Sequence, residues 1–396
     1  MGMIMSWQPS KRFYWGSSGA FALVAASLAL LPAAGCAEDR TVDTETGTIK
    51  VETLAEGLDH PWGMAFLPDG RLLVTERAGD LRIMSADGTL TEPLSGVPKV
   101  VATGQGGLLD VALDPNFADN KLVYLSYSEP GDGGAGTAVA RGRLAENAVE
   151  DVKVIFRQTP KVSGGNHFGG RLVFTPDGKL FITLGDRFKF EPAQDLTSHL
   201  GKIVRINPDG SVPPDNPFIG QKDAQPEIWS YGHRNVQSAA IHPKTGKLWE
   251  LEFGPKGGDE LNIPAPGLNY GWPAVSWGKH YDGKDIPNPP THPEFADAVR
   301  HWTPVISPSG ITFYTAEAHP GWTADTIPAW KGNLLIGGLS SQAIIRLTLD
   351  GETVSGEERI PMGARIRDVE QGPDGAVYAL TDAGDGAVLR LTAEGP

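Results

Sequence analysis

A recurring unit of two apolar strands joined by a short turn constrains the fold of this chain more than any other feature. The segment LVFTPDGKLFITLGD at 172–186 shows the unit most clearly, with two apolar runs on either side of a Pro-Asp-Gly turn. Alternating apolar residues between turn signals are typical of half-buried strands. Related segments lie at 64–88, 110–128, 202–210, 239–254, 332–351 and 369–395. Because no stretch beyond residue 36 has the apolar spacing of a long helix, the sequence predicts an all-β protein.

The turns divide the chain into about six such units, and four-stranded antiparallel units repeated around an axis make a β-propeller. We therefore predict a six-bladed β-propeller of four-stranded antiparallel blades over residues 49–396, in one closed domain. A β-sandwich is the alternative, but it seldom contains so many similar hairpins. The early segment GTIKVETLAEGL is expected to complete the last blade and close the ring.

The first 36 residues have the pattern of an export signal. Lys11 and Arg12 precede the apolar run GAFALVAASLALLPAAGC, which ends in small residues. An uncleaved membrane anchor is the alternative, because the run is only just long enough to span a bilayer. Cys36 is the single cysteine, so the chain has no internal disulfide. It resembles the lipid-attachment site of bacterial lipoproteins, or it is discarded with the signal. We predict export to the periplasm or outer surface, with residues 37–48 as a linker.

The charge balance bears on the partners of the exported part. Without residues 1–36 the chain keeps 32 basic and 48 acidic residues, a net charge of −16. An acidic surface without a basic run argues against nucleic acid and anionic lipid as partners. We therefore expect contact with a membrane only through a lipid on Cys36, and a monomer as the oligomeric state.

Several motifs place polar residues directly before a strand, at the same point of successive units. If the units surround an axis, these residues converge near one mouth of the channel. Guanidinium groups bind carboxylates in pairs, and oxygen-rich turns hold calcium, so the set predicts a pocket for a planar, polyanionic ligand. The candidates are Gln105 in GQGGLLD, His167 in HFGGRLVF, Arg234 and Asn235 in YGHRN, Glu252, Asp259 and Glu260 in ELEFGPKGGDELN, and Arg365 and Arg367 in GARIRDV.

Each candidate also has a purely structural interpretation. His167 is equally typical of a histidine bonded across a turn, and Asp186 of a turn cap. Arg365 and Arg367 alternate along one face of an extended segment, which is also what a solvated strand face shows. The turn GPKGGDE is also compatible with a plain hairpin loop. The other histidines, including His233, have no partner pattern and are interpreted as surface or turn residues.

From about residue 50 to its end the chain resembles the soluble glucose/sorbosone dehydrogenases. These are calcium-dependent quinoproteins that use pyrroloquinoline quinone, and the aldose sugar dehydrogenase branch is the most similar. The resemblance rests on GQGGLLD, HFGGRLVF, YGHRN, EFGPKGGDELN, NYGWP and RIRDV in one order. It implies an oxidoreductase that converts aldose sugars to lactones at the anomeric carbon and passes the electrons to an acceptor that the sequence does not name.

The resemblance also implies roles for particular residues. His167 resembles the general base that takes the proton of the anomeric hydroxyl while hydride passes to the quinone, and Asp186 the carboxylate that orients it. The residues that resemble cofactor contacts are Gln105, Arg234, Asn235, Arg365 and Arg367. The carbonyls of Gly254 and Pro255 resemble ligands of a calcium ion at the quinone, and Glu260 with the carbonyl of Tyr270 a second, structural calcium site.

One departure concerns the cofactor charge. In the glucose dehydrogenase branch a lysine contacts the cofactor from the loop that is GGLSSQAI here, where Ser340 or Ser341 takes its place. Two other classes stay open: a calcium-dependent propeller lactonase, and a non-catalytic propeller that binds carbohydrate or a protein. The arginines favour the quinoprotein. The preferred sugar, the electron acceptor and the supply of quinone in the cell are not readable from the sequence.

Overall fold

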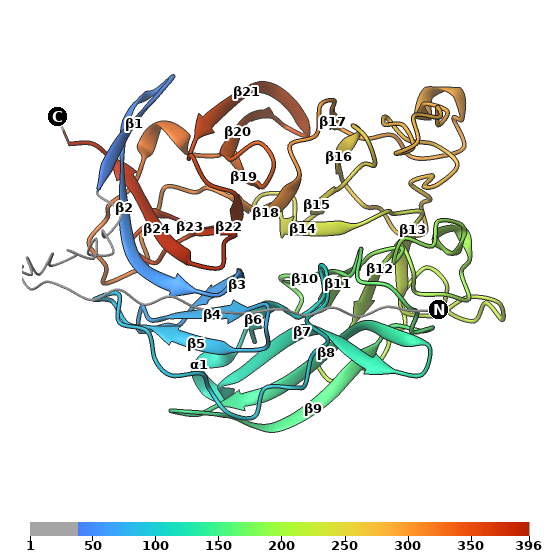
Figure 1. The fold of residues 1–396 in the computed structure, drawn as a ribbon, viewed down its shortest axis with the longest axis horizontal. Helices are drawn as coiled ribbons and strands as arrows, with labels where there is room; N and C mark the ends of the chain where they lie inside the picture. Colours follow the sequence, from blue (N-terminus) through green and yellow to red (C-terminus); the bar gives the residue numbers. More distant parts are fainter. Residues whose placement is uncertain (1–38, 396) are drawn as a thin grey trace, which may run out of the picture. The chain divides into compact units, whose positions relative to one another are not determined.

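The computed structural model describes residues 39–395, so the predicted signal over 1–36 lies outside the described residues. Residues 39–395 form six antiparallel sheets around one axis, which confirms the predicted six-bladed β-propeller (Figure 1). In this part of the chain no helix is long and apolar enough to cross a membrane. The helical elements there are short: α1 (Phe117–Asn120), η1 (Glu191–Gln194), η2 (Pro289–Thr291) and η3 (Pro328–Trp330).

Each of the first five blades is a meander, in which strands that follow one another in the chain are hydrogen-bonded neighbours, and β22–β24 of the last blade are arranged in the same way. The first blade has three strands instead of the four expected. The blades in chain order are β3–β5 (Pro61–Phe66, Leu72–Glu76, Leu81–Met84), β6–β9 (Leu108–Leu113, Leu122–Gly131, Gly134–Leu144, Val149–Arg157), β10–β13 (Gly169–Phe174, Leu180–Leu184, Lys202–Ile206, Ile228–Tyr231), β14–β17 (Val236–Ile241, Leu248–Glu252, Asp259–Asn262, Arg300–Trp302), β18–β21 (Pro308–Phe313, Leu334–Gly338, Ala343–Asp350, Thr353–Pro361) and β22–β24 (Ile366–Gln371, Val377–Thr381, Gly386–Ala393).

The two ends of the described chain meet in the last sheet. Strand β2 (Gly47–Leu58) pairs antiparallel with β24, with Val51 opposite Leu391, so the early strand completes the last blade as predicted. Strand β1 (Arg40–Thr44) adds a fifth strand outside β2. From residue 40 on, strand structure therefore replaces the linker expected over 37–48. This edge strand carries a single apolar residue, Val42, which is too weak a pattern to reveal it.

The second strand of most blades is buried along its whole length, because it lies between the faces of two neighbouring blades. All residues of β4, β11, β15, β19 and β23 are buried. One apolar cluster, for example, joins Leu184 of the third blade to Tyr124 and Val139 of the second. The apolar core therefore lies in layers between neighbouring blades, and the first strands surround the axis.

The first strand of every blade has a register irregularity against its neighbour close to its start. The irregularities fall between Pro61 and Met64, Leu108 and Val111, Gly169 and Leu172, Val236 and Ser238, Pro308 and Gly310, and Ile366 and Asp368. Such bulges bend a strand and re-aim its side chains, and they are frequent next to active sites. In the second, third and fourth blades they lie just after Gln105, His167 and Asn235, and in the last blade the irregularity encloses Arg367.

Candidate active site

His167 and Asp186 form a buried pair at one end of the third blade. His167 lies just before β10 and Asp186 just after β11, and 2.6 Å separate Nδ1 of the imidazole from Oδ1 of the carboxylate. The indole Nε1 of Trp272 donates to the other carboxylate oxygen over 2.8 Å, and the backbone N–H of Phe188 donates to Oδ1. Gln105 accepts the backbone N–H of His167 over 2.8 Å. The pair is therefore fixed from three sides.

The electrostatic surroundings hold the imidazole neutral. Burial lowers the pKa of His167, and the positive charges of Arg234 and Arg187 lower it further, against the effect of Asp186. Burial opposes ionisation of Asp186, but hydrogen bonds from His167 and Trp272 keep its pKa below the usual range. With its proton on Nδ1, the imidazole presents the lone pair of Nε2, for which the structure shows no hydrogen-bond partner in residues 39–395. An imidazole held in this way can accept a proton at Nε2.

A positively charged pocket of about 180 Å³ opens beside this pair. Gln105, Arg365 and Arg367 line it as predicted, together with Arg77, Gln237, Trp62, Phe253, Ser307 and Leu339. Arg365 and Arg367 share one carboxylate, that of Asp382, at 2.7 and 3.1 Å. Three guanidinium groups with one carboxylate leave a positive excess, which suits an anionic ligand.

Arg234 lines a second pocket and bonds to Phe253, which lines the first. Its Nη1 donates to the carbonyl oxygens of Phe253 and Gly254 over 2.8 and 2.9 Å. The second pocket, of about 290 Å³, is lined by Arg234, Pro255, Phe188, Phe190, His280, Tyr281, Asp282 and Lys284. Phe188 and Tyr281 stack at its edge with 6.2 Å between ring centroids. The site thus has a charged pocket and an aromatic pocket, which are linked through the bond from Arg234 to Phe253.

Buried donors without a partner mark where a ligand would bind. Among residues 39–395 they include Nε of Arg234, Nδ2 of Asn235 and Nε of Arg367. The carbonyl oxygen of the Asn235 side chain is used, because it accepts the backbone N–H of Gly169 over 3.1 Å. A buried donor without an acceptor costs about 1–3 kcal/mol. Three of them at residues predicted to bind one cofactor indicate that acceptor groups belong there.

The residues predicted to hold calcium line two cavities that share Arg234. Gly254 and Pro255 follow β15, and the Gly254 backbone N–H donates to Asp259, which fixes the turn. Glu260 and Tyr270 line a cavity of about 10 Å³ with Glu252 and Gly254, room for about one water molecule. Burial and then the charge of Glu252 raise the pKa of Glu260 well above its usual value. Carbonyl and carboxylate oxygens are the ligands that calcium prefers, and Glu260 supplies a carboxylate. The Gly254 oxygen already accepts Nη1 of Arg234, so an ion bound there would compete with that guanidinium.

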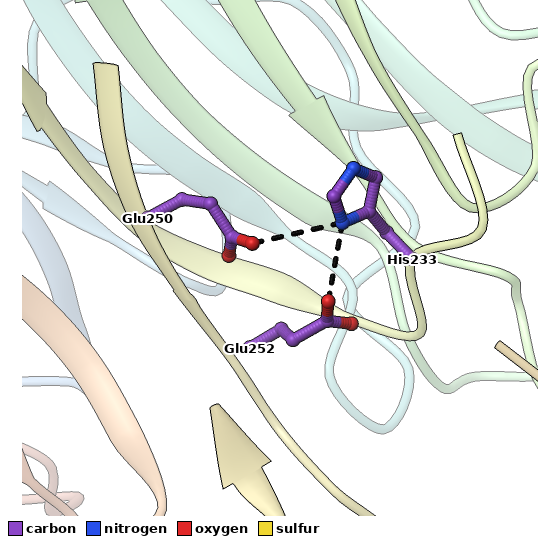
Figure 2. A group of neighbouring side chains, drawn as sticks. All are labelled: His233, Glu250 and Glu252. Atoms are coloured by element: carbon purple, nitrogen blue, oxygen red, sulfur yellow. Dashed lines mark hydrogen bonds and ion pairs between the residues drawn. The ribbon is translucent and has the colours of Figure 1, made fainter. Parts of the chain in front are cut away.

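His233 differs from its interpretation as a surface residue. It is fully buried, and its Nδ1 lies 3.1 Å from Glu252 and 3.6 Å from Glu250 (Figure 2). The Glu252 carboxylate also accepts the backbone N–H of Arg234 over 2.5 Å. The Glu252 carboxylate, which also contacts His233, therefore fixes the backbone at Arg234.

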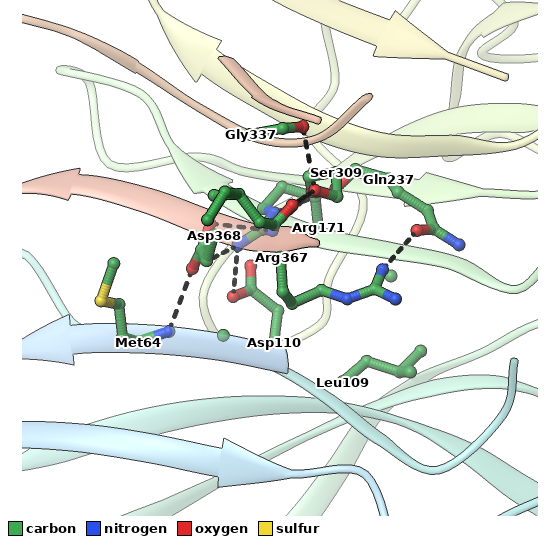
Figure 3. Close-up of polar contacts among 12 residues, drawn as sticks. Met64, Leu109, Asp110, Arg171, Gln237, Ser309, Gly337, Arg367 and Asp368 are labelled. Atoms are coloured by element: carbon green, nitrogen blue, oxygen red, sulfur yellow. Dashed lines mark hydrogen bonds and ion pairs between the residues drawn. The ribbon is translucent and has the colours of Figure 1, made fainter. Parts of the chain in front are cut away.

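The bulged residues close the channel below the pocket. Arg171 pairs with Asp110 over 3.0 Å and with Asp368 over 3.1 Å, and its Nε donates to the backbone oxygen of Gln237 (Figure 3). The side chain of Gln237 in turn accepts Nη1 of Arg367 over 2.9 Å. The floor of the site is thus a hydrogen-bonded network that crosses four blades.

Sequence reasoning missed Arg77, which lines the pocket, and Asp382, which pairs with Arg365 and Arg367. Both directly follow the second strand of their blade, β4 and β23, and Asp186 comes two residues after the end of β11. The ends of these three second strands are therefore a further signal for this site. Ser340, one of the two serines assigned to the position of the lysine in the glucose dehydrogenase branch, bonds to Ser307 over 2.7 Å.

Comparison with known proteins agrees with this geometry. The glucose/sorbosone dehydrogenase family model matches residues 58–390. The chain belongs to this family. It is 47% identical over 353 residues to the aldose sugar dehydrogenase YliI of Escherichia coli K12, covering 87% of this chain and 93% of that protein.

Solved structures of family members have the same fold. The apo form of the soluble aldose sugar dehydrogenase of Escherichia coli is 45% identical, with a TM-score of 0.81 over 87% of this chain and 100% of the other. The PQQ-bound aldose sugar dehydrogenase of Streptomyces coelicolor is 32% identical, with a TM-score of 0.71 over 89% of this chain and 100% of the other. One of these relatives thus binds the quinone that the sequence motifs imply here.

Proposed function

We propose that this member of the family is an exported quinoprotein that oxidises aldose sugars to lactones at the anomeric carbon. The observation that carries the proposal is the buried His167–Asp186 pair, with Nε2 of the imidazole unengaged, next to orphaned donors of Arg234, Asn235 and Arg367. The names of the similar proteins support the same substrate class. Export rests on the sequence pattern of residues 1–36.

Pyrroloquinoline quinone, when bound, supplies the carbonyl that accepts the hydride from the sugar. Its carboxylates match the guanidinium groups of Arg365, Arg367 and Arg234, with Gln105 and Asn235 as further contacts. The carbonyl oxygens of Gly254 and Pro255 would hold a calcium ion there, and Glu260 with Tyr270 a structural one.

Residues of the chain itself accept and stabilise the proton that the sugar loses. Nε2 of His167 takes the proton of the anomeric hydroxyl as the C1–H bond breaks, which places the positive charge on the imidazole. Asp186, 2.6 Å from Nδ1, stabilises that charge and keeps the ring oriented. The aromatic residues Phe188 and Tyr281 offer apolar faces to a sugar ring on the other side of Arg234.

The test mixes the purified protein with pyrroloquinoline quinone and calcium and measures oxidation of glucose with a dye acceptor. We expect activity only with both additions, and loss of activity in EDTA. The variant His167→Gln should lose about 100-fold or more in kcat while it still binds the quinone. His319→Gln, an exposed histidine with no site contact, is the matched control. Hydrolysis of lactones without quinone would instead indicate a lactonase. No activity in either assay would indicate a non-catalytic binding protein.

A further inference from the structure

Arg187 directly follows Asp186, and neither the motifs nor the proposed chemistry uses it. Its side chain is buried, with 1% of the residue exposed. No ion pair in residues 39–395 includes it, so its charge has no carboxylate in direct contact. A buried arginine without a counter-ion is costly, and burial lowers the pKa of its guanidinium to about 10. Proteins keep an unfavourable feature such as a buried, unpaired charge mainly at functional sites.

The guanidinium instead binds the loop that carries His167. Its Nε donates to the carbonyl oxygen of Asn166 over 2.8 Å, and Nη2 donates to that of Gly164. The guanidinium carbon lies 3.6 Å from the ring centroid of Phe168, and the backbone N–H of Arg187 donates to the His167 oxygen over 3.3 Å. Residues on both sides of the histidine are therefore fixed by one side chain.

A further contact ties this loop to the second blade, because Nη1 of Arg187 donates to the carbonyl oxygen of Ala135 in β8 over 2.5 Å. The loop needs such contacts because two of its residues have a positive φ, 52° for His167 and 55° for Arg187. Residues other than glycine adopt this left-handed conformation at a cost of about 1–3 kcal/mol, and they keep it only where surrounding contacts impose it. Only a planar group with five donors reaches three carbonyls in different directions.

The charge of Arg187 acts on the same imidazole. The charged groups that face His167 are Asp186, Arg234 and Arg187. Asp186 favours the protonated ring, and the two arginines oppose it. Arg187 thus opposes protonation of the free enzyme, which would block a general base.

We propose that Arg187 is a positioning residue, which holds the His167 loop in its reactive conformation and keeps the imidazole in its proton-accepting form. The proposal rests on the proposed function of His167 as the base. It does not depend on contact between Arg187 and substrate or cofactor.

Two substitutions separate the two roles. Arg187→Lys keeps a charge but cannot reach all three carbonyls, whereas Arg187→Met loses the contacts and the charge. Arg205→Met is the control: Arg205 is also buried and lies over a ring, that of Trp229 at 4.4 Å. It lies on β12 of the same blade, but its side chain bonds to Asp215 and Asn216 and not to the His167 loop. Each variant is first shown to fold by its thermal unfolding midpoint.

The first measurement is an NMR titration of the apo protein labelled in its histidine rings, with His167 assigned from the signal missing in His167→Gln. We expect the His167 midpoint to move to higher pH in Arg187→Met and to stay near the wild-type value in Arg187→Lys and Arg205→Met. Hydrogen exchange of the backbone at 164–168 should be faster in both Arg187 variants than in the control.

The second measurement is kcat of the enzyme loaded with quinone and calcium. Both Arg187 variants should lose about 100-fold, because a catalytic group displaced by about 1 Å costs that much. In Arg187→Met the acid limb of the pH profile should also move to higher pH. An unchanged His167 midpoint and unchanged exchange at 164–168 in Arg187→Met would overturn the proposal. Because the titration needs neither quinone nor sugar, it decides this proposal even if the wild-type protein oxidises no sugar, which would refute only the proposed function.

Discussion

At the scale of single residues, the Asp186 carboxylate decides which nitrogen of His167 carries the proton. Its Oδ1 accepts a hydrogen bond from Nδ1 of His167, and its Oδ2 accepts one from the indole of Trp272. In Asp186→Asn the amide group can donate to Nδ1, which moves the proton to Nε2 and removes the base. We expect kcat to fall by about 10²- to 10⁴-fold with the quinone still bound, as measured by sugar oxidation and quinone titration.

The control for this variant is Asp195→Asn, an exposed carboxylate of the same loop that bonds only to Thr197. Its kcat should stay within about twofold of the wild-type value, as for most surface substitutions. Equal losses in the two variants would mean that the loop tolerates no change at all, and that Asp186 has no special role.

The same scale shows how much of the site the sequence predicts. Gln105, Arg365 and Arg367 line one pocket, and Gln105 also contacts His167, because each lies before or at the start of the first strand of a blade. Their chemical roles stay predictions. Arg77 was not predicted, because a charge at the end of a strand has no distinct local pattern. His233 was misinterpreted because its partners Glu250 and Glu252 lie on another strand, which the sequence around it does not show.

At the scale of elements, the bulged first strands meet in the network of Arg171, Asp110 and Asp368. Burial raises the pKa of Asp110 to about 6 even beside Arg171. Arg171→Met would leave two buried carboxylates without their partner, and removing one member of a buried ion pair costs about 3–5 kcal/mol. We expect a loss of that size in the free energy of unfolding by urea. Arg359→Met, in an exposed pair with Glu357, should cost less than about 1 kcal/mol.

The pH dependence of this loss has a defined sign. A carboxyl group whose pKa is raised by folding holds a proton more tightly in the folded chain, so its contribution to stability falls as pH rises through that range. Without Arg171 the pKa values of Asp110 and Asp368 rise further, because the guanidinium lowers both. Arg171→Met should therefore be more destabilised at pH 8 than at pH 5. A loss that is the same at both pH values would show that the carboxylates find other partners.

The elements also differ in how visible they are in the sequence. The first two strands of a blade are joined by turns such as Pro-Asp-Gly in 172–186, and these hairpins were predicted at the right places. The edge strand β1 was not, because one apolar residue among four polar ones gives no periodicity. The bulges have no signal of their own, since they arise where six strands must fit around one axis.

At the scale of the whole molecule, the ring is closed by pairing between β2 and β24, which come from opposite ends of the described chain. Strand β24 lies between β2 and β23 and buries Val388, Leu389 and Leu391. Each of these side chains contributes about 1.5–3 kcal/mol when buried, and a whole domain is stable by only about 5–15 kcal/mol. Deleting residues 386–396 should therefore abolish cooperative unfolding near the wild-type midpoint.

Deleting residues 37–45 is the matched truncation, because it removes the outer strand β1 and leaves β2 paired with β24. The side chains of β1 are exposed or half-buried, so their loss removes little apolar burial. We expect calorimetry to show one transition, lowered by a few degrees, for this shorter chain, since about 1 kcal/mol shifts the midpoint by only a few degrees in a domain of this size. If both truncations lowered the midpoint equally, stability would lie within the separate blades and not in the closure of the ring. The geometry of the His167 site would then depend only on its own blade and the neighbouring blades. If closure of the ring carries the stability, that geometry also depends on β24, which belongs to another blade.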